Sequence, residues 1–197
     1  MSLTLISVAT NPGVLTYDLA LRSGEKIVLR PLVQSDSVAL ADFLSGLSLQ
    51  TRRFYDFESC DIRKAAELCD AIAKYDKLRF VVELTGNKII GLIEYSFDLT
   101  DDDTKRFAGY GYSLHQGSDC RFGPCLADEY QDQGLGSLLF PYVVEIAHRF
   151  DQKRIILWGG VLADNSRAIR YYQKNGFRAV GSFINAGIPC IDMLLAI

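Results

Sequence analysis

The sequence lacks several features that mark whole classes of protein. It has no apolar run long enough to cross a bilayer, and its first ten residues lack the positive charge that begins a secretory signal. Its 21 Lys and Arg residues are scattered among 24 Asp and Glu residues, so no basic stripe is available for nucleic acid. We therefore expect a cytoplasmic protein that binds neither membranes nor nucleic acid.

Histidine and cysteine are too few and too poorly spaced for a zinc site. The chain has two histidines and five cysteines, and the only close pair, Cys120 and Cys125, lacks the CxxC spacing of zinc ligands. An odd number of cysteines suits a reducing compartment, where a chain of 197 residues needs no disulfides. We therefore expect buried or idle thiols and no metal.

The length and the 49% hydrophobic content fit a single domain, 1–197, and the sequence has no linker or repeat. Apolar runs at 14–21 and 26–32 flank Arg22-Ser-Gly-Glu25 and predict a hairpin, so residues 1–25 are taken as an N-terminal extension. Helices are expected from Ser35 or Asp36 to Leu47, and over 61–75, 134–150 and 165–174. Further strands are expected over 79–85, 88–97, 120–127, 154–160, 177–183 and 189–197.

Three local signals refine this outline. Gly86-Asn87 favours a tight turn between two strands, and Pro141 should bend the helix that contains it. The polar, glycine-rich stretch 98–118 is expected to be a loop with a short strand at 107–114. Its charge run, Asp101-Asp-Asp103, is expected to be solvated rather than to attract substrate.

The segment that carries chemistry is Gln131-Asp-Gln-Gly134-Leu-Gly136-Ser137, which lies between a strand and an amphipathic helix. A helix start directs backbone N–H groups and the positive end of its dipole outward, and two glycines let an anion approach. The segment therefore predicts a diphosphate-binding loop, although a glycine-eased turn without a ligand would look the same. The lysine of an ATP-binding loop and the third glycine of a dinucleotide fingerprint are both missing.

Two longer motifs extend this interpretation. Leu126 to Leu139 resembles the acetyl-CoA motif of the GNAT superfamily, a strand followed by Gln/Arg-x-x-Gly-x-Gly/Ala and a helix. Asn165 to Phe177 resembles the second motif of that family, Asn-x-x-Ala followed by Tyr and Gly-Phe. The resemblance covers about residues 120–183. It implies a mixed α/β fold, a mainly antiparallel twisted sheet that is splayed where CoA inserts, with helices on both faces.

The resemblance also implies acetyl-CoA as co-substrate and assigns roles by position. Backbone groups of Leu126 and Ala127 would hold the pantetheine arm. Backbone N–H groups would hold the diphosphate, from the residues Gln131, Asp132, Gln133, Gly134, Leu135, Gly136 and Ser137. Asn165 would reach the pantetheine or diphosphate, although it could equally cap the next helix. Tyr172 would lie near the thioester sulfur, with core packing as its alternative role.

Two departures from the family pattern are visible. Asp128 stands where the family often has proline, and Pro141 lies in a helix that is usually uninterrupted. Neither is one of the two glycines of the loop, so we expect CoA binding to be intact.

Acetyl transfer needs a neutral amine, hydrogen-bond donors for the oxyanion and a proton for the departing thiolate. We expect Tyr172 to protonate the CoA sulfur and a backbone N–H near Leu126 to stabilise the oxyanion. Glu94 is the first candidate for the base, because it is a carboxylate within an apolar strand, unless its face of the strand meets solvent. Lesser candidates are Asp128, Glu129 and His115.

We therefore predict an N-acetyltransferase that moves an acetyl group from acetyl-CoA to a primary amine by direct attack in a ternary complex. Segments 27–32 and 47–57 resemble the opening of bacterial GNAT domains that acetylate protein lysines, while polyamines, aminoglycosides and amino acids stay open as acceptors. The alternative is a GNAT-fold module that binds or senses acetyl-CoA without turnover. GNAT relatives often form homodimers, and the sequence leaves oligomeric state and acyl length open.

Overall fold

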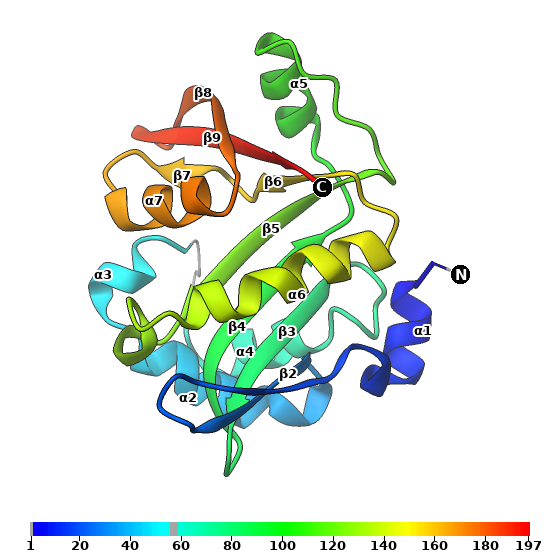
Figure 1. Ribbon diagram of the computed structural model, residues 1–197, viewed down its shortest axis with the longest axis vertical. Coiled ribbons are helices and arrows are strands. Elements are labelled where there is room, and N and C mark those ends of the chain that lie inside the picture. Colours follow the sequence, from blue (N-terminus) through cyan, green and yellow to red (C-terminus); the bar gives the residue numbers. More distant parts are fainter. Residues whose placement is uncertain (1, 56–58) are drawn as a thin grey trace. The chain divides into compact units, whose positions relative to one another are not determined.

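The computed structural model describes residues 2–55 and 59–197 and shows a mixed α/β fold in which most strand pairings are antiparallel (Figure 1). This confirms the predicted fold class. The chain divides into two compact units, one of residues 3–95 and 124–139 and one of residues 96–123 and 140–197. Asp56 and Phe57, which end the segment 47–57, lie outside the described residues.

The first unit is built on four antiparallel strands that follow one another in chain order. The strands are β1 (Tyr17–Ala20), β2 (Lys26–Pro31), β3 (Leu78–Leu84) and β4 (Lys88–Ser96). Gly86 and Asn87 join β3 to β4 with φ angles of 87° and 63°, the left-handed backbone that a tight hairpin turn requires. The predicted turn is therefore confirmed, and so is the hairpin of β1 and β2.

Two helices cover this sheet. They are α2 (Ser37–Gly46), preceded by the short η2 (Gln34–Asp36), and α4 (Ile62–Cys69), with α3 (Leu49–Arg52) between them. Apolar side chains of α2 and α4 share one core with strand residues such as Val81 and Leu92. The helix predicted over 61–75 ends at Cys69, so only its first half is confirmed.

The N-terminal extension differs from the prediction. It begins with a helix, α1 (Leu5–Thr10), followed by η1 (Pro12–Leu15), and the strand expected from Val14 begins only at Tyr17. Thr4 and Ser7 form reciprocal side-chain to backbone hydrogen bonds at the start of α1. This capping box stabilises a helix whose six residues are too few to give a periodic apolar pattern.

The second unit contains one parallel and three antiparallel strand pairings. Residues 119–122 of β5 (Asp119–Leu126) run parallel to β6 (Arg154–Leu157). The long strand β9 (Ile188–Ala196) pairs antiparallel with β6, with β7 (Val161–Leu162) and with β8 (Arg178–Asn185). The helix α7 (Ser166–Lys174) confirms the element predicted over 165–174.

The stretch 98–118 was predicted as a loop with a short strand, and this is wrong. It contains a helix, α5 (Asp101–Gly109), whose first turn is capped by Thr100 and Asp103. Asp103 is 3% exposed and accepts a hydrogen bond of 2.8 Å from Arg106. The acidic run is therefore partly a buried helix start rather than a solvated loop.

The long helix α6 (Leu135–Arg149) follows the short η3 (Asp128–Tyr130) and contains Pro141 without ending there. The amphipathic helix predicted here is confirmed, because apolar side chains spaced three or four residues apart are buried, among them Leu135, Leu139, Val143, Ile146 and Ala147. In the described parts of the chain, no helix combines the length and the apolar character needed to span a membrane.

Candidate functional site

The glycine-containing loop before α6 has the backbone form expected of an anion-binding turn. Asp132 and Gly134 have φ angles of 59° and 86°, and the N–H of Leu138 donates to the carbonyl of Gly134 at 3.0 Å to close the first helical turn. Alternating right- and left-handed residues turn successive N–H groups toward one side of a loop. The residues from Gln131 to Ser137, which we call the cradle, combine a loop containing two left-handed residues with the N-terminus of α6, an arrangement in which backbone N–H groups and the helix dipole can bind an anion.

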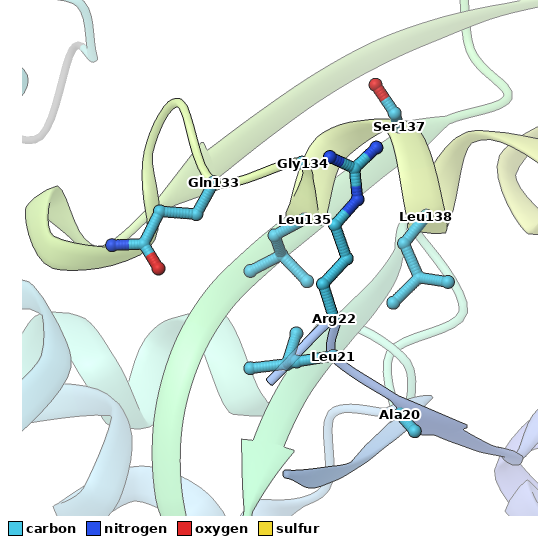
Figure 2. Close-up of a pocket in the computed structure, with 8 residues that line it drawn as sticks. All are labelled: Ala20, Leu21, Arg22, Gln133, Gly134, Leu135, Ser137 and Leu138. Carbon is cyan, nitrogen blue, oxygen red and sulfur yellow. The ribbon is translucent and has the colours of Figure 1, made fainter. Parts of the chain in front are cut away.

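A pocket of about 220 Å³ adjoins the cradle and lies within the first unit. Figure 2 shows its lining residues, which are Ala20, Leu21, Arg22, Gln133, Gly134, Leu135, Ser137 and Leu138. A Cβ atom added at Gly134 would lie 3.4 Å from both Cζ and Nε of Arg22, so the guanidinium rests against the start of α6. The sequence analysis placed Arg22 only in a hairpin turn and missed its position at the cradle.

The two glutamines of the cradle use their side chains to hold the loop. The Nε2 of Gln131 donates to the carbonyl of Leu126 at 2.8 Å and to Oγ1 of Thr51 at 3.2 Å. The Nε2 of Gln133 donates to the carbonyl of Glu129 at 2.5 Å. The side-chain Nε2 atoms of both glutamines are thus used within the protein, and the ligand-binding role of their backbone stays a prediction.

Asp128 joins the same loop to α3. Its carboxylate accepts hydrogen bonds from the N–H of Ser48 at 2.9 Å, from the Ser48 hydroxyl at 2.6 Å and from the Thr51 hydroxyl at 2.6 Å. Partial burial acts to raise the pKa of Asp128, but these donors together outweigh it and hold the pKa below its ordinary value. A carboxylate that stands where the family often has proline thus ties the loop to Ser48, the N-cap residue of α3, and to Thr51.

The end of β5 lies close against β4. The N–H of Ala127 donates to the carbonyl of Ile90 at 2.9 Å, and the carbonyl of Ala127 accepts from the N–H of Tyr130 at 2.9 Å. A Cβ atom at Gly91 would lie 2.9 Å from Cδ2 of Leu126, so a larger residue would force the Leu126 side chain to shift. The carbonyl of Leu126 accepts from Nε2 of Gln131, and a carbonyl oxygen has two lone pairs. The part of Gly91 in this packing was missed, since an isolated glycine in a strand gives only a weak signal.

Glu94 does not stand alone in its strand. It is paired across the sheet with Arg79, whose Nε lies 2.5 Å from Oε1 of Glu94. The side chain of Arg79 is 10% exposed and that of Glu94 is 17% exposed. Arg79 also donates to the carbonyl of Leu68 at 3.3 Å. The carboxylate is thus half-buried, as one sequence interpretation required, and a guanidinium balances its charge.

The three lesser candidates for the base have other contacts. Asp128 is held by Ser48 and Thr51, and Oε1 of Glu129 lies 3.2 Å from Nζ of Lys88 on an exposed surface. His115, in the second unit, donates its backbone N–H to Asp119 at 2.6 Å. None of these contacts makes Asp128, Glu129 or His115 a better candidate for the general base than Glu94.

Asn165 and Tyr172 belong to the second unit. Oδ1 of Asn165 accepts from the N–H of Ala168 at 3.1 Å, so the helix-cap role is present in the structure. Tyr172 is 7% exposed and its ring centroid lies 5.3 Å from those of Tyr171 and Phe177. Burial raises the pKa of the Tyr172 hydroxyl well above its ordinary value, so the hydroxyl stays protonated at neutral pH. A protonated phenol is the form that can donate a proton.

Four of the five cysteines are buried. Burial raises the pKa of Cys69 and of Cys120 to about 12, so neither is a thiolate at neutral pH. Cys125 and Cys190 are buried too, their pKa values are also raised by burial, and Cys60 is half-buried. Among these described residues, the four fully buried thiols are poor nucleophiles.

Comparison with known proteins agrees with the fold and the motifs. The sequence model of the acetyltransferase (GNAT) family matches residues 45–177, which is more than half of the chain. No curated protein is similar enough in sequence to be matched.

Solved structures share the fold at low sequence identity. The GNAT domain of S. lividans PAT is 16% identical, with a TM-score of 0.72 over 94% of this chain and 99% of that one. The ribosomal-protein-S5-alanine acetyltransferase from Vibrio fischeri is 16% identical, with a TM-score of 0.71 over 92% and 96% of the two chains. An aminoglycoside acetyltransferase in complex with coenzyme A is 20% identical, with a TM-score of 0.67 over 86% and 94%. By its sequence, this chain belongs to the acetyltransferase (GNAT) family.

Proposed function

We propose that this protein transfers an acetyl group from acetyl-CoA to a primary amine. The observation that carries the proposal is the cradle, a helix start with two left-handed residues, Asp132 and Gly134, beside a pocket of about 220 Å³. Pockets for whole small ligands measure about 300–1,000 Å³. The pocket beside the cradle therefore suits one part of CoA, its diphosphate, rather than the whole molecule.

Each part of acetyl-CoA has a proposed set of partners. Backbone N–H groups from Gln131 to Ser137 bind the diphosphate, because a helix start and its dipole favour an anion there. Backbone groups of Leu126 and Ala127 hold the pantetheine arm, and Asn165 combines its cap of α7 with a contact to the same arm or the diphosphate. When bound, acetyl-CoA supplies the thioester that is attacked.

The proposed chemistry assigns one task to each of three groups. An alkyl ammonium has a pKa of about 10.4, so the amine must lose a proton before it attacks. Glu94 takes that proton directly or through water, and its ion pair with Arg79 at 2.5 Å fixes the carboxylate in place. A backbone N–H near Leu126 stabilises the oxyanion, and the protonated hydroxyl of Tyr172 gives a proton to the CoA sulfur.

Direct transfer in a ternary complex is favoured over a covalent acyl-enzyme. An acyl-enzyme would need a nucleophile such as a thiolate. Burial raises the pKa of Cys69 and of Cys120 to about 12, which keeps both as thiols. This disfavours an acyl-enzyme on these two cysteines, and we propose that the amine attacks the thioester itself.

The acceptor is proposed only as a class. The related structures include an aminoglycoside acetyltransferase and a ribosomal-protein-S5-alanine acetyltransferase, so amines of small molecules and of proteins both occur as acceptors on this fold. The half-buried Glu94 suits an amine of either kind, and a panel of both kinds is the test.

The first experiment measures acetyl-CoA binding by calorimetry for wild type and Gly134→Glu. The substituted side chain adds bulk and a negative charge at the cradle, so binding near one per chain should be abolished. Gly86→Glu is the matched control, because Gly86 has the same left-handed backbone (φ 87° against 86°), has open space around it and does not line the pocket. Equal loss in both variants, or no binding by folded wild type, contradicts the proposed site.

A second experiment separates an enzyme from an acetyl-CoA sensor. Release of free CoA thiol is followed with a panel of polyamines, aminoglycosides, amino acids and lysine peptides. Turnover that falls about 10- to 100-fold in Tyr172→Phe, with acetyl-CoA affinity unchanged, supports the catalytic role of that hydroxyl. Binding without thiol release from any amine favours the sensor.

A further inference from the structure

Arg22 lies where an anion at the cradle would meet it. It stands at the turn between β1 and β2, and its exposed side chain reaches the start of α6, where its Cζ and Nε lie 3.4 Å from the position of a Cβ on Gly134 (Figure 2). Arg22 is the one charged residue among the eight that line the pocket. A hairpin of the N-terminal segment thus contributes directly to the pocket beside the cradle.

The positive charge of Arg22 is not balanced by an acidic partner among the described residues. It forms no ion pair or side-chain hydrogen bond with any of them, and the pocket lining includes no Asp or Glu. Other arginines of the same unit are paired, since Arg30 contacts Asp36 at 2.7 Å and Arg79 contacts Glu94 at 2.5 Å. Arg22 lacks the carboxylate partner that Arg30 and Arg79 have.

The place of Arg22 is electrostatically unfavourable without an anion. A helix N-terminus carries a partial positive charge and favours anions, whereas a cation beside it is repelled. Here the guanidinium lies against Gly134 at the N-terminus of α6, beside the pocket. An anion bound in the pocket would be attracted both by the guanidinium and by the helix N-terminus.

We propose that Arg22 binds the diphosphate of acetyl-CoA and closes the cradle from the side of the β1–β2 hairpin. This inference rests on the proposed function. The planar guanidinium offers two parallel N–H donors to one phosphate, and the adjoining start of α6 offers backbone donors to the same anion. The N-terminal hairpin is thereby part of the cofactor site and not only a structural extension.

The experiment compares binding of CoA and of 3′-dephospho-CoA by calorimetry in wild type, Arg22→Ala and Arg22→Lys. Loss of a charged donor pair should weaken both ligands by about tenfold in Arg22→Ala. Arg22→Lys keeps the positive charge but lacks the two parallel N–H donors, so its affinity for both ligands should lie between those of wild type and the alanine variant. Lys26→Ala is the matched control, because it removes a cation from the same hairpin but not from the pocket lining. Its affinity for both ligands should stay within about twofold of the wild-type value.

Each outcome decides one part of the proposal. Equal affinities of wild type and Arg22→Ala overturn the role of Arg22. A loss seen with CoA but absent with 3′-dephospho-CoA overturns the diphosphate assignment, because it moves the contact to the 3′-phosphate. A wild type that binds neither ligand overturns the proposed function instead. Circular dichroism of each variant verifies folding, and Arg22→Lys still tests the contact if the alanine variant misfolds.

Discussion

The cradle and the ion pairs around Asp192 use charge in opposite ways. Asp192 is fully buried in the second unit and accepts from Arg106 at 2.9 and 3.2 Å and from the Tyr110 hydroxyl at 3.1 Å. Arg106 also pairs with Asp103 at 2.8 Å, and together these four residues form what we call the Asp192 network. Beside the cradle, Arg22 faces a helix N-terminus with no acidic residue in the pocket lining.

This difference distinguishes structure from binding. A buried charge must be paired within the chain, because an unpaired one costs several kcal/mol. An exposed cation costs little in stability when unpaired, so it remains available to a ligand from outside. The Asp192 network thus holds α5 against β9, while Arg22 is positioned for an anion that the chain does not supply.

Breaking the Asp192 network should have the largest effect on stability. Asp192→Asn removes the negative charge that pairs with Arg106, and we expect a loss of about 3 kcal/mol in the free energy of unfolding. Urea unfolding measures the loss, and acetyl-CoA affinity of the folded variant should be unchanged. A loss of less than about 1 kcal/mol would mean that Asp103 alone satisfies Arg106.

The same substitution at two arginines sharpens the comparison. Arg154 donates to Asp119 at 2.7 and 2.6 Å, and Asp119 is fully buried. Arg154→Ala leaves that carboxylate with the backbone N–H of His115 as its remaining described donor, and should cost about 2 kcal/mol. Arg22→Ala should change stability by no more than about 0.5 kcal/mol. Thermal and urea unfolding of both variants test this, and similar losses would contradict the distinction.

Local sequence signals predicted the elements whose causes are local. Gly86-Asn87 specified its turn by backbone preference alone, and the spacing of apolar residues specified α6. The cradle was also predictable, because its glycines and the helix that follows are adjacent in the chain. Gln131 and Gln133 were assigned to the ligand by position, and their side-chain bonds to Leu126, Thr51 and Glu129 depend on the folded loop.

Long-range contacts explain what the sequence analysis missed. The helix α5 is stabilised by pairs such as Arg106 with Asp192, which are distant in sequence, so its acidic run looked like a solvated loop. Arg22 reaches the cradle only because the β1–β2 hairpin brings it there, and no local pattern joins it to Gly134. Glu94 looked like a lone buried carboxylate because strand register, not sequence, sets Arg79 beside it.

The hydrogen bonds of Asp128, beside the cradle, should stabilise the fold as the Asp192 network does, but by a smaller amount. Asp128→Asn removes the charge that accepts from Ser48 and Thr51, and should cost about 1 kcal/mol near pH 7 because the site is partly exposed. The folded pKa of Asp128 is below its ordinary value of 3.8, so the carboxylate stabilises the fold above that value. The difference between wild type and variant should therefore be constant from about pH 7 to pH 5, and should shrink as pH falls below 3.8 toward the lower folded pKa. Urea unfolding across this range measures it, and a difference that grows with acidity would contradict the hydrogen-bonded carboxylate.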